Sequence, residues 1–130
     1  MGYANRQNGG HMDDLHLHCG PTRTVAFTLP AALAARLSGK GRLRSDRCRR
    51  LCAAYVLEAQ RGDDRFLREA EALAREREPE TGLSRVSVKM HEGLCARIEA
   101  LRSDPSLPLA SLVRAMVLLA WFYMGDELWP

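Results

Sequence analysis

Two short segments of the chain carry polar side chains at every second position, and these side chains could bind the edges of nucleic-acid bases. One segment presents Thr24, Ala26 and Thr28, and the other presents Arg85, Ser87 and Lys89. Because successive side chains of a β-strand point to opposite faces, each set would share one face of its strand. Arg and Lys donate hydrogen bonds to guanine, and Ser and Thr bond several bases or lay a methyl group against thymine. The solvated outer face of a small hairpin is the alternative interpretation.

Apolar residues fill the positions between these polar ones, which predicts that both segments are strands with one buried face. These residues are Val25, Phe27 and Leu29 in the first segment and Val86, Val88 and Met90 in the second. If the strands pair antiparallel, they form a two-stranded ribbon with a polar, partly cationic outer face. Such a ribbon fits the major groove of B-DNA.

The two segments belong to an internal repeat. Residues 25–37 align without a gap on residues 86–98, and the same offset of 61 residues carries Ser45 onto Ser106. Each copy has the pattern of a strand, a helix, a polar turn and a second helix with serine at its N-cap. A strand followed by two helices cannot bury its apolar face alone, so we expect the two copies to complete each other.

The chain is predicted to form a tail and one domain. We expect a flexible tail over residues 1–20 and a single domain over residues 21–130, with repeat one at about 22–60, a connecting helix at about 63–78 and repeat two at about 83–124. The strands are expected at about Arg23–Leu29 and Arg85–Met90, and Pro30 is expected to begin the first helix. The last helix is apolar nearly all round, which indicates a central core element. A partner-binding face is the alternative.

Charge is unevenly placed along the chain, although the formal net charge is only +3. The basic residues of the first copy are Arg23, Arg36, Lys40, Arg42, Arg44, Arg47, Arg49 and Arg50, with Asp46 as the only acid among them. A local basic face of this kind favours a polyanionic partner more than the net charge suggests.

Cysteine usage and hydropathy predict a cytoplasmic protein. Cys48 and Cys52 lie one helical turn apart among apolar neighbours, which favours buried, reduced thiols and a reducing compartment. No apolar N-terminal stretch has the pattern of a signal peptide. The most apolar segment, residues 112–124, is shorter than the roughly 20 residues of a membrane span, so we expect no membrane partner.

The order of these patterns resembles a known family. Val86-Ser-Val-Lys-Met90, followed by a helix with Leu94 and Ile98, a polar turn and a serine-started helix, resembles the ribbon-helix-helix fold of DNA-binding proteins. Two copies in one chain resemble the tandem, single-chain form, found in accessory proteins of plasmid conjugation and in the virulence protein that binds the enhancer beside the T-DNA border. The sequence Leu-Ala-Trp-Phe-Tyr-Met that ends at Met124 is similar to the latter group.

The resemblance implies a fold and a function. The fold would be mainly α with a two-stranded antiparallel ribbon, formed by two ribbon-helix-helix repeats that make one intramolecular pseudo-dimer. The function would be sequence-specific binding of double-stranded DNA, as an accessory factor for conjugative or T-DNA transfer. A relaxase or another transfer-complex protein would be a partner, and monomeric chains could assemble side by side on DNA. No cofactor is implied.

The resemblance also assigns roles to residues. The ribbon residues expected to contact bases are Thr24, Ala26, Thr28, Arg85, Ser87 and Lys89. The residues expected to contact phosphates, around the N-terminus of each second helix, are Arg23, Arg42, Arg44, Ser45, Arg47 and Ser106. Asp46 would repel a phosphate in the first copy, and Pro108 removes one amide donor in the second.

Other functions are open alternatives. A ribbon-helix-helix transcriptional repressor, or a protein-interaction module that uses the apolar C-terminal helix, would fit the same pattern. His91-Glu92-Gly-Leu-Cys95 begins like a zinc-protease helix but has cysteine in place of the second histidine, and packed side chains are the simpler interpretation. His11, His16, His18 and Cys19 could bind adventitious metal. We expect no metal site and no enzyme activity.

Overall fold

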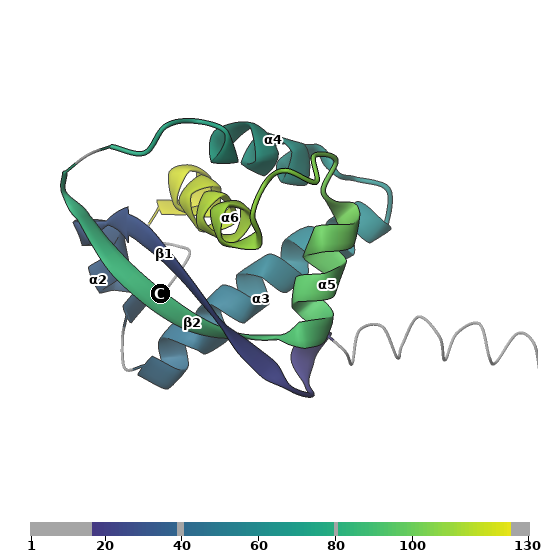
Figure 1. The fold of residues 1–130 in the computed structure, drawn as a ribbon, viewed down its shortest axis with the longest axis horizontal. Coiled ribbons are helices and arrows are strands. Elements are labelled where there is room, and N and C mark those ends of the chain that lie inside the picture. The colour runs from purple at the N-terminus through teal and green to yellow at the C-terminus, as the bar shows by residue number, and fades with distance from the viewer. Residues whose placement is uncertain (1–16, 39–40, 80, 126–130) are drawn as a thin grey trace, which may run out of the picture.

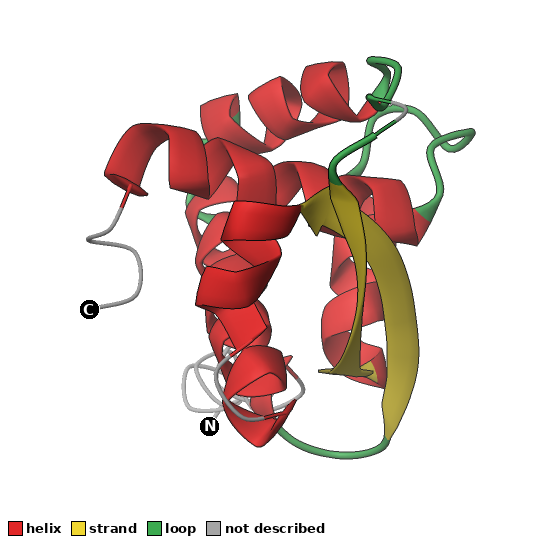
Figure 2. Cartoon of the chain, turned by 90° about the vertical axis from the view of Figure 1, so that its left-hand side faces the viewer, coloured by secondary structure: helices red, strands yellow, loops and turns green. Residues whose placement is uncertain are grey.

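The computed structural model describes residues 17–38, 41–79 and 81–125. This part of the chain is mainly helical with one two-stranded antiparallel sheet, which confirms the predicted fold class at that level (Figures 1 and 2). The elements, in chain order, are β1 (Thr22–Pro30), α2 (Ala31–Ser38), α3 (Gly41–Gln60), α4 (Arg65–Ala74), β2 (Leu83–His91), α5 (Glu92–Leu101) and α6 (Leu109–Met124).

The sheet joins two strands that are distant in sequence. Thr22 lies opposite His91, Ala26 opposite Ser87 at the centre, and residue 30 opposite residue 83. One further backbone hydrogen bond continues the ladder at each end. The N–H of Ala31 donates to the Gly82 carbonyl at 3.0 Å, and the N–H of Glu92 donates to the Pro21 carbonyl at 2.8 Å. The strands and the helix starts that follow them are therefore held together from end to end.

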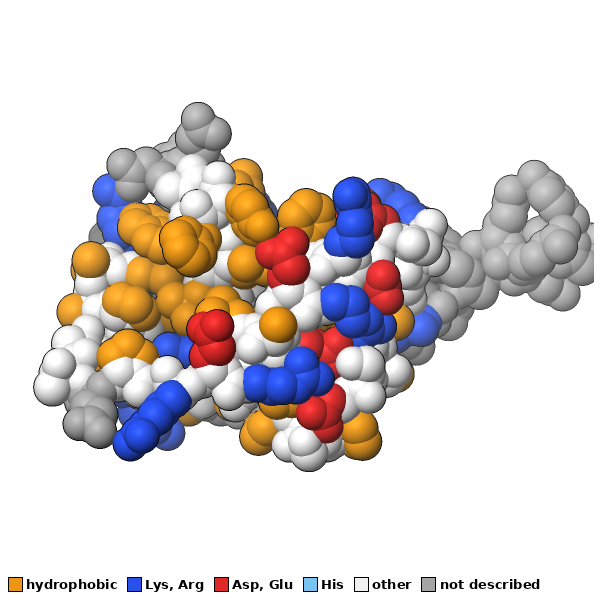
Figure 3. Space-filling view, turned by 90° about the horizontal axis from the view of Figure 1, so that it is seen from above, with side chains coloured by type: hydrophobic (Ala, Val, Ile, Leu, Met, Phe, Trp, Pro, Cys, Tyr) orange, Lys and Arg blue, Asp and Glu red, His pale blue; other side chains and the backbone are white. Residues whose placement is uncertain are grey.

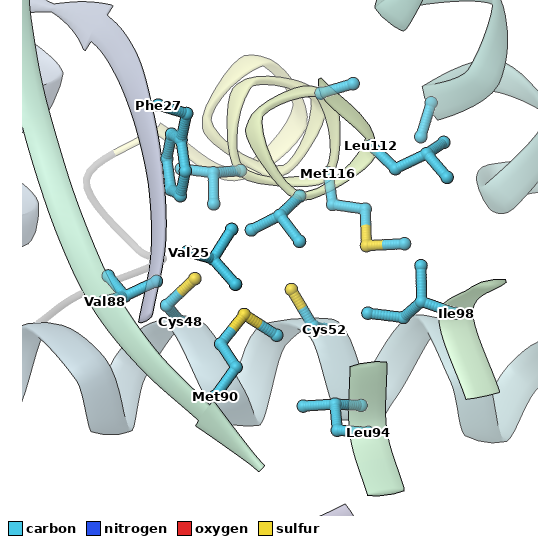
Figure 4. Close-up of a cluster of buried hydrophobic side chains, with 14 of the residues drawn as sticks. Val25, Phe27, Cys48, Cys52, Val88, Met90, Leu94, Ile98, Leu112 and Met116 are labelled. Atoms are coloured by element: carbon cyan, nitrogen blue, oxygen red, sulfur yellow. The ribbon is translucent and has the colours of Figure 1, made fainter. Parts of the chain in front are cut away.

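The ribbon lies across one side of the molecule and covers α3 and α6 (Figure 1). Its predicted inner residues, Val25, Phe27, Leu29, Val86, Val88 and Met90, are all buried. They meet Cys48 and Cys52 of α3, Ile98 of α5, and Leu112 and Met116 of α6 in one cluster (Figure 4). The α6 residues from Leu112 to Val117 are all buried, which confirms that this helix is a central core element.

Several predicted boundaries are wrong, and the reasons are local. Helix α3 begins at Gly41, so Ser45 lies inside the helix and is not its N-cap. Helix α6 begins at Leu109 with Pro108 at its N-cap, because the Asp104 carboxylate accepts the N–H and hydroxyl of Ser106 and holds that residue in a turn. Residue 30 ends β1, and α2 starts one residue later than predicted.

The connecting helix and the tail also differ from their predicted extents. Helix α4 occupies Arg65–Ala74 only, within the predicted 63–78, and residues 75–79 follow it as a non-helical segment. Leu17, which the sequence placed in the tail, is fully buried in the core cluster. Residues 1–16 of the predicted tail lie outside the described part of the chain.

A buried carboxylate ties α4 to the turn that precedes α6. The side chain of Glu71 is 1% exposed and forms an ion pair with Arg68. It also accepts the N–H of Ser103 at 2.7 Å, the Ser103 hydroxyl at 2.9 Å and the N–H of Asp104 at 3.2 Å. Burial raises the pKa of Glu71, but the hydrogen bonds from Arg68, Ser103 and Asp104 outweigh it and hold the pKa below its ordinary value.

We expect Glu71→Gln to lower the free energy of unfolding at pH 7 by about 1–3 kcal/mol, because it removes the charge that these donors face. A carboxylate with a lowered pKa in the folded state stabilises the fold above the unfolded-state pKa of about 4.3, and that stabilisation is lost as the pH falls through the folded-state pKa. The difference between variant and wild type should therefore shrink in acid. Urea unfolding from pH 7 to pH 3 measures it, with the exposed Glu76→Gln as control. If the difference in unfolding free energy between Glu71→Gln and wild type were the same at pH 7 and pH 3, the Glu71 carboxylate would not stabilise the fold through its charge.

We also expect the two halves of the chain to depend on each other. Each strand of the ribbon has the other as its ladder partner, and a lone strand leaves its edge and apolar face uncovered. Residues 1–80 and 81–130, expressed separately, should be unfolded or self-associated, and mixing them should restore a folded complex. Circular dichroism and sedimentation measure this. Two monomeric halves with independent cooperative melting would contradict it.

Candidate nucleic-acid interface

The outer face of the ribbon brings the six predicted base-contacting residues together. The register pairs Thr24 with Lys89, Ala26 with Ser87, and Thr28 with Arg85, so one polar face carries three cross-strand pairs. The side chains of Thr24, Arg85, Ser87 and Lys89 are exposed, and those of Ala26 and Thr28 are half-buried. The face contains hydrogen-bond donors at both ends and small residues at its centre.

Two cations mark the ends of this face. Arg85 and Lys89 lie four positions apart on β2, about 13 Å along the strand. Neither side chain forms an ion pair with the described residues. Both are therefore free to meet an external acceptor.

Two residues of α3 hold β2 in place at the Lys89 position. The Lys89 N–H donates to the Ser45 hydroxyl at 2.9 Å, and the Arg49 guanidinium donates to the Lys89 carbonyl at 2.8 Å. Ser45 is buried at 9% exposure. It therefore positions the backbone of a predicted base-contacting residue, and it does not lie at the helix N-terminus where a phosphate contact was expected.

The other predicted phosphate contacts have different surroundings. Arg23 lies on the inward-facing side of β1 and pairs with Glu99 at 3.1 Å and with Glu92 at 4.0 Å. Arg47 donates to the Arg36 carbonyl at 3.1 Å.

Three predicted phosphate contacts remain beyond these. Arg44 is half-buried, with its Nε enclosed and without a hydrogen-bond partner among the described residues. Ser106 is exposed, and its hydroxyl donates to Asp104 at 2.6 Å. The side chain of Arg42 lies outside the described residues.

The residues that hold the opposite end of the ribbon were not predicted from the sequence. Arg114 of α6, whose side chain is 9% exposed, donates from Nε to the Thr28 carbonyl at 2.9 Å. The same Nε lies 2.9 Å from a carboxylate oxygen of Glu78, which accepts the Thr28 hydroxyl at 3.1 Å through its other oxygen. A single arginine in an otherwise apolar helix was the available signal, because a buried charge requires a partner.

The residues that suggested catalysis or metal binding have structural neighbours. The Nδ1 atom of His91 lies 3.1 Å from the Gly20 carbonyl oxygen. Burial raises the pKa of the Cys95 thiol, which disfavours the reactive thiolate. None of the four cysteines forms a disulfide, and no group of metal-ligating side chains occurs among the described residues. His11 and His16 lie outside those residues.

An apolar hollow lies near the C-terminal end of α6. Leu51, Ala54 and Tyr55 of α3, Phe66 of α4, and Ala120, Tyr123 and Met124 of α6 line it, beside Glu58 and Asp63. Phe66 and Tyr123 meet edge to face with ring centroids 6.0 Å apart, and the Tyr123 hydroxyl donates to Glu69 at 2.7 Å. Seen from above, hydrophobic side chains gather on one side of the molecule and mixed charges on the other (Figure 3).

Comparison of the chain with models of known protein families, with curated proteins and with solved structures finds no match. Among the described residues, no helix combines the length and the apolar character that crossing a membrane requires.

Proposed function

We propose that this chain is a sequence-specific double-stranded DNA-binding protein that inserts the β1–β2 ribbon into the major groove. The observation that carries the proposal is the single outer face on which Arg85, Ser87 and Lys89 lie opposite Thr28, Ala26 and Thr24. Two antiparallel strands are about 5 Å apart, and the major groove is about 12 Å wide, so a ribbon with short side chains at its centre can approach the base edges.

We further propose that the two repeats form a single-chain ribbon-helix-helix pseudo-dimer, related by an approximate two-fold axis. The ladder supports this, because residues 61 positions apart, Ala26 and Ser87, face each other at its centre. The bonds that close the ladder follow the same relation. The two donors, Ala31 and Glu92, are 61 positions apart. The two acceptors, Pro21 and Gly82, are also 61 positions apart.

Contacts between the helices and the strand edges also support the pseudo-dimer. Arg114 donates to the Thr28 carbonyl, and Arg49 donates to the Lys89 carbonyl. The two accepting residues, Thr28 and Lys89, are 61 positions apart. The Tyr55 hydroxyl donates at 3.0 Å to the carbonyl of Met116, which is again 61 positions away. Residue pairs that bond across to their own counterparts are expected near a two-fold axis.

The sequence resemblance supports the further step to a role in conjugative or T-DNA transfer, with a relaxase among the partners. A transcriptional repressor would use the same ribbon in the same way. A pulldown of a relaxase from cells that contain the neighbouring genes would favour transfer, and derepression of a neighbouring promoter on deletion would favour the repressor.

A protein-interaction module is the second candidate, and one observation favours it. Phe122 and Tyr123, at the end of α6, are 83% and 62% exposed, which is unusual for large aromatic side chains. If the chain bound no duplex DNA even at low salt, this candidate would replace the first.

We expect Arg85→Ala and Lys89→Ala each to weaken binding to the preferred duplex site by about 1–3 kcal/mol, because each removes a donor to a base edge. Binding to unrelated duplexes should change much less. Fluorescence anisotropy at several salt concentrations measures both affinities.

Arg61→Ala is the matched control for these two variants. Arg61 follows the end of α3 distant from the ribbon, and its side chain is 70% exposed and paired with Glu58. The control removes the same charge and should leave base preference unchanged. If Arg85→Ala and Lys89→Ala bound the preferred site as well as wild type, insertion into the groove would be the wrong model.

The two strands of the ribbon differ, so we expect one chain to select an asymmetric DNA element. The β2 strand, with Arg85 and Lys89, should favour steps that contain guanine, and the β1 strand, with its Thr and Ala side chains, should favour thymine methyl groups. Several chains side by side would select direct repeats. Selection from random duplexes measures the consensus. A strongly two-fold symmetric consensus for one protomer would contradict the single-chain ribbon, because unlike strands have no reason to choose like half-sites.

A further inference from the structure

The end of the ribbon at Thr28 carries an arrangement that the proposed DNA contacts do not explain. The Arg114 side chain is 9% exposed, whereas the Glu78 side chain paired with it is 47% exposed. Glu78 belongs to the non-helical segment between α4 and β2, and Arg114 belongs to the core helix α6. The cation is therefore fixed by the fold, while its carboxylate comes from an exposed connection.

Glu78 also engages one of the residues proposed to contact DNA. Its second carboxylate oxygen accepts the Thr28 hydroxyl at 3.1 Å. Thr28 lies opposite Arg85 in the ladder. At this end of the outer face, the Thr28 hydroxyl is thus bonded to an acidic side chain of the protein itself.

The surroundings of the Glu78 carboxylate suit an anion. A hollow of about 250 Å³ there is lined by Thr28 and Arg85 of the ribbon, by Ser111 and Arg114 of α6, and by Glu78 itself. Ser111 lies in the first turn of α6, where the helix dipole adds positive potential. The Arg114 guanidinium and the Thr28 hydroxyl contact the Glu78 carboxylate, and Arg85 and Ser111 line the same hollow.

A phosphodiester of the DNA backbone could replace that carboxylate. Its two non-bridging oxygens share one negative charge and accept hydrogen bonds from arginine and hydroxyl groups as a carboxylate does. DNA seated on the ribbon would bring its backbone close to the ribbon ends, where a carboxylate repels phosphate. The Glu78 carboxylate and a DNA phosphate cannot bind Arg114 and Thr28 at the same time.

We propose that Arg114 and Thr28 form a phosphate-binding site that Glu78 fills in the free protein and yields to the DNA backbone. This inference rests on the proposed DNA binding. Glu78 then acts as an internal competitor that lowers affinity for every duplex, and it makes stable binding depend on displacement of the Glu78 side chain.

The test compares Glu78→Gln with Glu76→Gln in the full-length protein. Both variants remove one negative charge from the same segment. Glu76 is exposed and its side chain has no partner among the described residues, so it serves as the matched control. Glu78→Gln should bind duplex DNA about fivefold more tightly than wild type, the size expected from relief of one charge contact at about 4 Å in water. Glu76→Gln should change affinity by less than about twofold, because salt screens a distant charge.

Three outcomes would overturn the competition. Glu78→Gln could bind DNA no better than wild type, or both variants could gain affinity equally, which would make the effect one of net charge alone. Absence of DNA binding by wild type and both variants at low salt would instead defeat the proposed function and this inference with it. The first two outcomes leave the proposed function intact, so the two failures are distinguishable.

A second measurement uses the wild-type protein and does not depend on the folding of a variant. The Nε–H resonance of Arg114, which reports the loss of its Glu78 partner, should shift as duplex DNA is added and saturate with the binding curve. A resonance that stays unchanged at saturating DNA would overturn the proposed exchange of anions.

Discussion

The pairing of β1 with β2 is the interaction on which the rest of the structure depends. A two-stranded sheet is marginal by itself, and here its strands are joined by a long stretch of chain, so closing the ladder costs substantial conformational entropy. Burial of the inner face against α3, α5 and α6 offsets that cost. Because the apolar residues alternate with polar ones, the same pairing that buries Val25 and Val88 also assembles the outer face that we propose binds DNA.

In the pseudo-dimer that we propose, the two copies meet equivalent structural needs with different residues. The outer-edge carbonyls of Thr28 and Lys89 each require a donor, and Arg114 supplies one while Arg49 supplies the other. These arginines do not align in the repeat, since the offset of 61 residues carries Arg49 onto Ala110, four residues before Arg114. The backbone relation between the copies is thus closer than the side-chain relation, and divergence of this kind leaves the two halves of the ribbon chemically unlike.

Several basic residues of the first copy hold the fold together and are not simply available to bind an anion. Arg49 bonds the ribbon backbone, Arg47 bonds the Arg36 carbonyl, and Arg50 pairs with Asp46 at 3.0 Å. Groups held in this way still contribute positive potential, but they are less available as direct ligands. At the other end of the ribbon, Glu78 also serves the fold at the expense of the outer face. It pairs with Arg114 of the core helix, and it accepts the Thr28 hydroxyl, which lies on the outer face.

The sequence by itself determined the two strands, their inner and outer faces and the burial of the last helix, because the alternation of apolar and polar residues and the apolar run of the last helix depend only on residue order. Tertiary structure decided the helix starts and the partners of the polar residues. Ser45 has the side chain of a helix cap but lies inside α3, where the Lys89 N–H needs an acceptor. Arg114 required a partner, yet no local pattern could identify Glu78, because the contact arises only when segments distant in sequence meet in the folded chain.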